Sequence, residues 1–511
     1  FLFVGAVFGF GPMQLMLEED GVYASQCTIE EQENGIICDD QTIALVNIPF
    51  IAGLCSIFSP YLGKIGDHYG SSVLMHVAGI LGCLGVGMTI ISSTTGIDQL
   101  FYVAFSLLYL MLMAGCIMIS KTGLVFEGDT RRRVISVLNS LLDSGSVTYL
   151  ILFKVKSITG ASYVEIMSGY LLVAVIVFSA SSYVWNYLAR MDWEVHPSAA
   201  VRSSISKNGK GISTDVASSV STSAKLETGV GGQATNGNPE CYCGKNPNSD
   251  YVMIRYRDSK GQLGSRMFIF LTIFYTFHGI RNIFTLTTAR DFLGYLGDDE
   301  VDNRYLSIFV WLTPASLLGQ SLIDYVLGNY GYIVGLQVVN ALGLLQGIIQ
   351  VSSNNLNIQI IGFLAFSFYR GFLFSVVFSF LVTFLSHDTV GKATGSMSAI
   401  TAVVKFVNVP IANWAINVLG GDFFWPNLVY TICIVPLFFV VWGIGEDKTK
   451  EKQAEEFVCD QCLRKQVDEG LQINESNSNT VLNELPTNLK YTNFAPRGMT
   501  FCHGISCNAF L

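Results

Sequence analysis

The chain has 511 residues, of which half are hydrophobic and 14% are charged, and its formal net charge is -9. Soluble proteins carry about 25% charged residues, and the mean hydropathy of this chain is +0.45, so the composition excludes an ordinary soluble protein. The basic residues are placed as a membrane topology requires and imply no nucleic-acid partner.

Twelve apolar stretches, in two groups of six, dominate the chain. A helix needs roughly 20 apolar residues to cross the ~30 Å hydrocarbon core of a bilayer, where it satisfies its own backbone hydrogen bonds. The first group lies at 1–17, 42–62, 71–92, 99–120, 134–153 and 164–188. The second group lies at 266–287, 304–325, 332–351, 358–385, 393–418 and 427–445. We therefore expect an all-α membrane protein with twelve transmembrane helices in two six-helix bundles, at 1–189 and 265–445.

Two polar segments flank the second bundle, a central loop at 190–264 and a tail at 446–511. Their Ser-, Gly- and Asn-rich runs cannot bury a core, so we expect both to be largely disordered. At the other end of the chain, Phe1 lies inside an apolar run and no signal peptide is visible, so we expect the chain to be clipped within or just before its first helix.

Charge is distributed unevenly among the connecting segments. Segment 18–40 holds eight acidic residues and no Lys or Arg, whereas 190–266 holds ten Lys or Arg and 121–133 holds Lys121, Arg131, Arg132 and Arg133. Basic loops remain in the cytoplasm. The pattern predicts an acidic loop outside and both termini inside, with the tail available to cytoplasmic partners. We expect a multi-pass protein of the plasma membrane.

The twelve cysteines divide by compartment. Cys27 and Cys38 fall in the external loop and either form a disulfide or stay free. Four others lie in apolar helices and are expected to be packing residues: Cys55, Cys83, Cys116 and Cys433. In the tail, Cys459 and Cys462 resemble half of a zinc site and Cys502 and Cys507 the other half, but about 40 residues separate them. We predict no metal site and no cofactor.

A short motif is repeated in the two halves. Gly63-Lys-Ile-Gly-Asp67-His-Tyr-Gly70 follows the second predicted helix, and a similar stretch from Gly319 through Asp324 to Gly331 follows the eighth. Repetition of this kind indicates internal duplication, as in many transporters. The first stretch resembles the loop motif of the major facilitator superfamily, which implies a gate formed by Gly63, Asp67, Gly70 and Asp324. His68 stands where that motif usually has Arg, which implies a weaker or pH-sensitive gating ion pair.

A narrower resemblance runs through residues 5–445. The chain is similar to the sodium-independent large-neutral-amino-acid facilitators of that superfamily and their protist relatives. The similar stretches are Gly9-Phe10-Gly11-Pro12, Ser136-Val-Leu-Asn139-Ser-Leu-Leu-Asp143-Ser144, Ile280-Arg281-Asn282, Tyr369-Arg370, Gly391-Lys-Ala-Thr394-Gly395 and Gly420-Gly-Asp422. The resemblance implies alternating access and facilitated diffusion of neutral, large or apolar amino acids without sodium.

Ionisable residues inside the spans are functional candidates, because their burial in a membrane is costly. An amino acid is a zwitterion and needs donors for its carboxylate and acceptors for its ammonium group. Asn139, Asp143 and Ser144 lie on one polar helix face and can accept from the ammonium group or from a coupling proton. The guanidinium group of Arg370 can bind a substrate carboxylate through two hydrogen bonds. The alternative is a structural clamp between Asp143 and Arg370.

Further candidates surround these residues. Arg281 and Asn282 can bind substrate or close the outer gate, or Arg281 can snorkel to the surface. Gly9, Gly11 and Pro12 break the first helix, which either offers backbone groups to a ligand or permits close packing. Three aromatic residues can shape the side-chain pocket: Phe10, Phe284 and Tyr369. His278 can titrate during a cycle or be a satisfied helix histidine, and Lys405 is expected to pair structurally.

No catalytic or ATP-binding motif is present in the sequence, so we expect neither an enzyme nor an ATP-driven pump. Three alternatives remain beside neutral-amino-acid diffusion. One is proton coupling through Asp143 or His278. Another is a different small metabolite, such as a cationic amino acid or an organic anion. The third is a nutrient sensor that does not transport and signals through its loop and tail.

Overall fold

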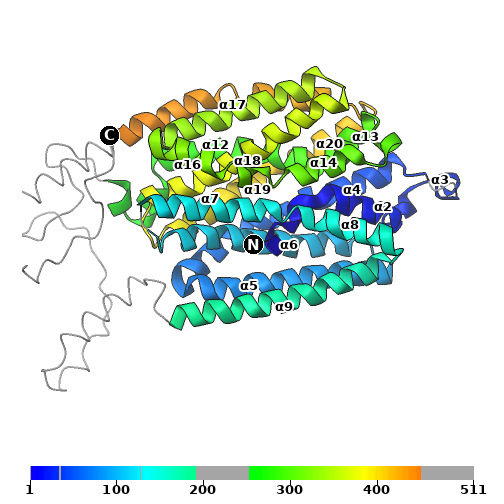
Figure 1. Ribbon diagram of the computed structural model, residues 1–511, viewed down its shortest axis with the longest axis horizontal. Coiled ribbons are helices and arrows are strands. Elements are labelled where there is room, and N and C mark those ends of the chain that lie inside the picture. The colour runs from blue at the N-terminus through cyan, green and yellow to red at the C-terminus, as the bar shows by residue number, and fades with distance from the viewer. Residues whose placement is uncertain (1, 34–35, 127, 191–252, 450–511) are drawn as a thin grey trace, which may run out of the picture.

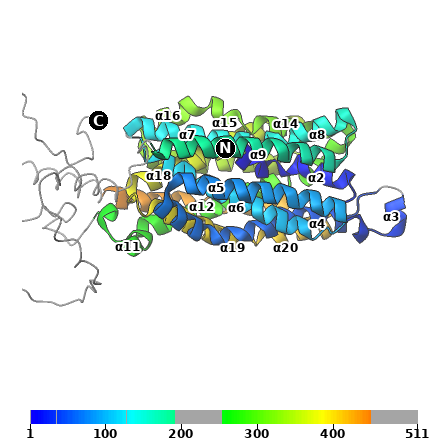
Figure 2. The ribbon, with the colours of Figure 1, turned by 90° about the horizontal axis from the view of Figure 1, so that it is seen from below.

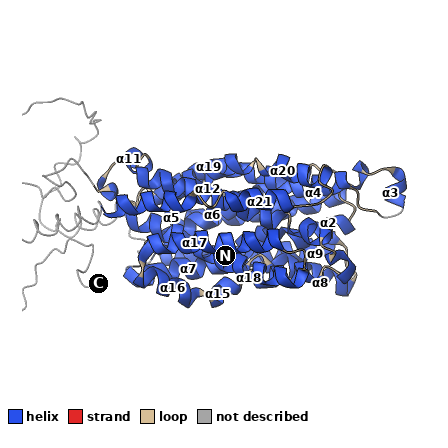
Figure 3. Cartoon of the chain, turned by 90° about the horizontal axis from the view of Figure 1, so that it is seen from above, coloured by secondary structure: helices blue, strands red, loops and turns tan. Residues whose placement is uncertain are grey.

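The computed structural model describes residues 2–33, 36–126, 128–190 and 253–449 (Figure 1). Every regular element in these ranges is helical, and most helices run along the long axis of the molecule (Figure 3). The expected disorder of 191–252 and 450–511, and the tail cysteines, lie outside the described residues.

The first bundle is built from helices that are often broken within a single crossing (Figure 1). It comprises α1 (Leu2–Gly5), η1 (Ala6–Gly9), α2 (Phe10–Glu19), α4 (Asp39–Ala52), η3 (Gly53–Phe58), α5 (Ser59–Thr95), α6 (Leu100–Gly123), α7 (Gly128–Ser144), α8 (Val147–Thr159) and α9 (Tyr163–Arg190). Between α2 and α4 lie η2 (Ala24–Gln26) and the short α3 (Ile29–Glu33).

The second bundle lies beside the first, with its elements coloured green to orange (Figure 1). It comprises α12 (Arg266–Thr287), α13 (Ala289–Tyr295), η5 (Asp298–Val301), α14 (Arg304–Leu312), α15 (Ala315–Leu318), α16 (Gln320–Asn329), α17 (Gly331–Ser352), α18 (Leu356–Phe384), α19 (Val390–Lys405), α20 (Asn408–Asn417) and α21 (Phe424–Ile432). It is preceded by η4 (Ile254–Tyr256) and α11 (Ser259–Leu263).

The described elements are all helical and include long apolar helices that can cross a membrane, which confirms the predicted fold class. By length and hydropathy, nine helices of the described residues qualify as spans, and the pair 304–318 and 320–329, bent by 44°, is a tenth. One of the nine, Asp39–Thr95, is 57 residues long and therefore crosses twice. It is broken at Gly70, whose φ of 84° favours glycine. The broken run Leu2–Glu19, which the sequence predicts as the first span, is not among these helices.

The connecting segments at the two ends of the molecule differ in charge. At one end lies α3, in a loop where the structure joins Cys27 and Cys38 in a disulfide, one of the two outcomes left open. We call this the acidic end. At the opposite end lie the start of α7, with Arg131, Arg132 and Arg133, and the short helix α11 (Figure 2), and we call it the basic end.

The last part of the expected central loop is structured and docks on the second bundle. Met253 and Ile254 are buried, and the Asp258 carboxylate caps α11 by accepting from the Gly261 amide at 3.0 Å. The Gln262 side chain donates to the Arg257 carbonyl at 2.8 Å and accepts from the Ser386 amide at 3.0 Å. Residues 253–264 therefore belong structurally to the second bundle.

Candidate functional site

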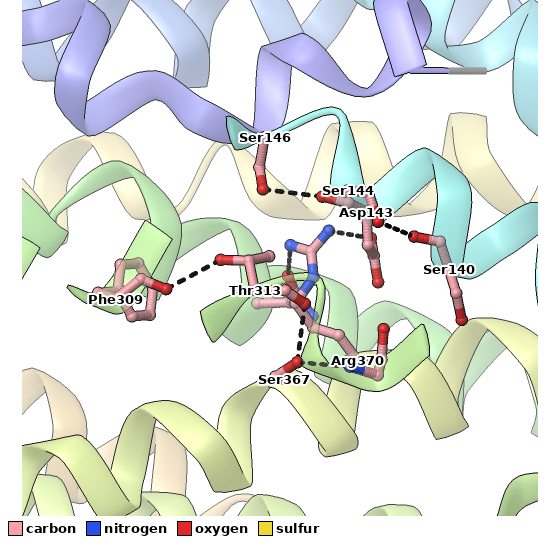
Figure 4. Close-up of polar contacts among 10 residues, drawn as sticks. Ser140, Asp143, Ser144, Ser146, Phe309, Thr313, Ser367 and Arg370 are labelled. Atoms are coloured by element: carbon pink, nitrogen blue, oxygen red, sulfur yellow. Dashed lines mark hydrogen bonds and ion pairs between the residues drawn. The ribbon is translucent and has the colours of Figure 1, made fainter. Parts of the chain in front are cut away.

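The centre of the molecule holds an ion pair between the two bundles (Figure 4). Arg370 on α18 donates through Nη2 to Oδ1 of Asp143 on α7, at 2.5 Å. Its Nη1 donates to Oδ1 of Asn282 on α12, at 2.7 Å. The side chains of Arg370 and Asp143 are 0% and 1% exposed. The structure thus brings together three of the predicted site residues.

Aromatic rings surround the guanidinium group of Arg370. Its central carbon lies 4.3 Å from the ring centroid of Phe8, 5.6 Å from that of Phe374 and 5.8 Å from that of Phe366. Rings at these distances attract a cation through their quadrupole. They also supply apolar surface beside the polar pair. The site therefore combines a charged centre with an apolar wall.

Several polar atoms at this centre are buried without a hydrogen-bond partner among the described residues. They are Oδ2 of Asp143, Nε of Arg370 and Nδ2 of Asn282. A buried polar atom left without a partner costs about 1–3 kcal/mol. The centre consequently offers one acceptor and two donors that a small polar ligand can satisfy.

The other predicted residues of α7, Asn139 and Ser144, form their hydrogen bonds with groups other than Arg370. Asn139 donates to the Ile135 carbonyl of its own helix at 3.0 Å, and its Oδ1 is another buried atom with no partner in the described residues. Ser144 donates to the Ser140 carbonyl at 2.8 Å. Ser140 itself reaches Gln320 of the other bundle, at 3.4 Å.

Arg281 lies inside the second bundle, away from the ion pair. It donates to the Gly343 carbonyl at 2.6 Å and to the Gln346 side chain, and it is 3% exposed. It neither contacts Arg370 nor snorkels to the surface. Arg281 therefore holds α12 against α17.

His278 and Tyr369 form a second network within the same bundle. The His278 ring nitrogens lie 2.8 Å from the Tyr369 hydroxyl and 2.9 Å from Oδ1 of Asn340. Both ring nitrogens have partners, and all three residues belong to the second bundle. This arrangement fits a satisfied helix histidine.

The first helix packs closely at its break. A Cβ atom on Gly9 would overlap with the Ser146 carbonyl of the α7–α8 turn, and one on Gly11 would lie 3.0 Å from Leu306. The Phe10 ring packs edge-on against Phe105, with 5.6 Å between centroids. Phe8 contacts the ion pair instead. The 3₁₀ turn η1 precedes Phe10 and has fewer residues per turn than an α-helix, so it changes which side chains face the centre. Helical periodicity alone therefore does not identify Phe8 as the aromatic residue that contacts the ion pair.

The basic end is closed by the repeated motif. The Asp67 carboxylate accepts from the Gly391 and Lys392 amides of α19, at 3.0 and 2.9 Å, and pairs with Lys121. In the other half, Asp324 lies 3.4 Å from Arg133 of α7. Each motif acid thus contacts the opposite bundle at the basic end.

Gly63 and Gly70 act through the backbone at this end. A Cβ atom on Gly63 would overlap with the Gly391 carbonyl, so glycine permits α5 and α19 to approach closely. Gly70 breaks the long helix after the motif. His68 packs edge-on against Tyr69, with 4.6 Å between ring centroids.

The acidic end also carries contacts between the bundles. Gln14 of α2 donates to Asp291 of α13 at 3.1 Å, and Glu18 lies 3.5 Å from Arg290. Phe50 stacks on Phe284 at 6.4 Å between ring centroids. None of these polar residues was predicted, although Gln14 and Glu18 stand four apart at the end of an apolar run, a spacing that places them on one helix face. The central ion pair is therefore flanked by inter-bundle contacts on both sides.

No family model matches the chain, and no curated protein matches it. Among solved structures it resembles the proton:xylose symporter XylE bound to 6-bromo-6-deoxy-D-glucose. The TM-score is 0.58 and the identity 12%, over 86% of this chain and 93% of that one. It also resembles the human organic anion transporter MFSD10 (TETRAN), with a TM-score of 0.53 and 11% identity, over 86% of this chain and 97% of that one. The chain therefore has the fold of the major facilitator superfamily.

Proposed function

We propose that the chain is a secondary transporter that works by alternating access, and that its substrates are neutral, large or apolar amino acids moved without sodium. The observation that carries this proposal is the buried Arg370–Asp143 pair, which joins the two bundles and has polar atoms without partners beside it. Alternating access requires two halves that separate around a central site. An ion pair between the halves lies where such a site is needed.

The chemistry of the pair suits a zwitterion. A substrate carboxylate can accept hydrogen bonds from the Arg370 guanidinium and from Nδ2 of Asn282. A substrate ammonium group can donate to the Asp143 carboxylate. One buried ion pair is then replaced by two, so neither charged side chain is left alone in a low-dielectric interior. Phe8, Phe366 and Phe374 offer apolar surface to the side chain of the substrate.

The orientation in the membrane follows from charge. With Lys121 and the arginines of α7 at the basic end, the positive-inside rule assigns that end to the cytoplasm and the disulfide-bearing loop to the outside. A disulfide also fits an oxidising compartment. We propose the plasma membrane as the location.

Uptake into proteoliposomes tests the proposal. Radiolabelled leucine, phenylalanine, arginine and glutamate are supplied with and without imposed proton and sodium gradients. We expect saturable uptake of leucine or phenylalanine that is indifferent to the gradients and is lost in Asp143→Asn and Arg370→Ala. Arg304→Ala, at an exposed arginine of α14, is the matched control and is expected to transport normally.

An organic anion is the second candidate substrate, because the guanidinium of Arg370 alone suffices for it. Glutamate uptake that survives Asp143→Asn would favour this class, since an anion does not need the Asp143 carboxylate. Uptake that requires a proton gradient would identify a symporter. Binding of leucine without flux would favour a sensor.

A further inference from the structure

Two carboxyl groups from different bundles share one hydrogen-bond donor at the acidic end. Nε2 of Gln14 donates to Oε1 of Glu18 at 2.9 Å and to Oδ1 of Asp291 at 3.1 Å. Gln14 and Glu18 belong to α2, and Asp291 belongs to α13. A single amide nitrogen therefore joins an acid of the first bundle to an acid of the second.

Negative charge outweighs positive charge in this cluster. Arg290 lies 3.5 Å from Oε2 of Glu18 and 3.1 Å from Oδ1 of Asp299, and its charge also acts on Asp291. One guanidinium thus faces three carboxyl groups. The side chain of Glu18 is 4% exposed. Like charges this close and this shielded repel strongly, which favours protonation of one carboxyl group.

Three buried atoms of the cluster have no hydrogen-bond partner among the described residues: the acceptors Oδ2 of Asp291 and Oε1 of Gln14, and the donor Nε of Arg290. A proton on Asp291 would add a donor to this set and remove one negative charge. The geometry thus favours a protonated carboxyl group while the two helices are in contact.

The elements packed around α13 bring further charged groups, but these are engaged elsewhere or exposed. Lys156 of α8 pairs with Glu19, and Asp298 accepts from the Tyr305 and Leu306 amides at 2.8 Å each. Glu300 and Arg304 are exposed. Arg290 is therefore the cation that faces the pair directly.

We propose that Glu18 and Asp291 form a proton-binding site which holds the acidic end closed while it is protonated and releases it when the proton is lost. The site is a gate in the alternating-access cycle proposed above, and its chemistry does not depend on the substrate. Opening hydrates Asp291 and separates it from Glu18. The proton then leaves towards the acidic side and returns from the same side on closure. The site therefore makes opening depend on pH without carrying a proton across the membrane.

The pKa of Asp291 supports this role. Burial, and then the charge of Glu18, raise the pKa of Asp291 to about 7, against about 3.9 for an exposed aspartate. In the closed form this carboxyl group is thus mainly protonated at pH 6 and mainly charged at pH 8. If opening restores the ordinary pKa, linkage makes the open fraction about tenfold larger at pH 8 than at pH 6.

Hydrogen exchange of the whole protein in lipid nanodiscs, without substrate, measures this opening. The protection of backbone amides in α2 and α13 is compared at pH 6 and pH 8 after correction for the intrinsic exchange rates. We expect protection to fall about tenfold at pH 8 in the wild-type protein. Asp291→Asn, which mimics the protonated acid, should remain protected at both pH values. Asp302→Asn, an exposed aspartate of the same end, should behave as the wild type.

A wild-type protection that does not change between pH 6 and pH 8 overturns the proposal, as does an unchanged pH dependence in Asp291→Asn. Glu18→Gln is a second variant, in case Asp291→Asn does not fold. It removes the charge that raises the pKa of Asp291, so the midpoint should move to lower pH, and an unmoved midpoint also counts against the site. Absence of amino-acid uptake would leave this exchange result intact, so the two proposals fail separately.

Discussion

Arg370 and Asp143 neutralise each other across the interface of the two bundles, with 2.5 Å between Nη2 and Oδ1 and almost no exposure of either side chain. Each residue is the charge partner that makes burial of the other tolerable. In the transport cycle proposed above, a substrate that separates them must replace both interactions. The stability of the protein therefore reports on the pair independently of any transport assay.

Removing one charge of this pair should cost more than removing both. Asp143→Asn leaves a buried guanidinium unpaired, and we expect a loss of about 3–5 kcal/mol. The double variant Asp143→Asn with Arg370→Gln should recover most of that loss. Thermal unfolding in detergent measures both, with Arg266→Gln as a control at a half-exposed ion pair. Equal losses in the single and double variants would contradict the mutual dependence.

Close contact at the basic end predicts opposite effects for two glycine substitutions in α5. Gly63→Ala places a methyl group against the Gly391 carbonyl and should destabilise the protein by about 1–3 kcal/mol. Gly87→Ala meets no atom within 4 Å, so its better helix propensity should make it neutral or stabilising by up to about 1 kcal/mol. Denaturation midpoints distinguish the two, and a neutral Gly63→Ala would argue against this helix contact.

The Asp67 carboxylate should control opening at the basic end. Asp67→Ala leaves the Gly391 and Lys392 amides without their acceptor, which costs about 1–3 kcal/mol. Amides in the first turn of α19 should then exchange about 5 to 150 times faster. Asp388→Asn, at an exposed neighbour, is the control. Unchanged exchange in Asp67→Ala would show that other contacts close this end.

Arg281 should matter for stability and not for selectivity. Arg281→Gln loses hydrogen bonds to the Gly343 carbonyl and to Gln346, so we expect a loss of about 1–3 kcal/mol. The ratio of leucine to phenylalanine uptake should stay unchanged, because the side chain does not reach the central pair. Thermal unfolding and paired uptake assays measure the two quantities. A changed ratio at unchanged stability would return Arg281 to the substrate site.

The fold was predictable from the sequence because lipid imposes a minimum length on each apolar helix. The loop expected at 63–70 is helical instead, and the second and third predicted spans are separated only by the break at Gly70. The docked segment 253–264 was not predicted, because its composition resembles that of a loop. Its local signals are small: Asp258 as an N-cap and the apolar pair Met253 and Ile254.

The residue types of the site were predictable, but which of the side chains face the centre of the molecule was only partly predictable. Asp143, Asn282 and Arg370 were expected and do meet. Their sequence neighbours Arg281 and Tyr369 were expected with them and point into the second bundle instead. Successive residues of an α-helix are turned by about 100°, so two adjacent polar residues cannot both face the centre. Sequence alone does not say which of the two does.

Contacts at both ends leave Arg370 out of reach from either side of the membrane in this form of the protein. A ligand of the proposed central site can therefore associate only with the fraction of molecules that has opened. Its apparent affinity falls in proportion to that fraction, and its association rate is limited by the frequency of opening. An inhibitor that wedges one end apart would gain affinity by relieving this cost, without any added contact to the central pair.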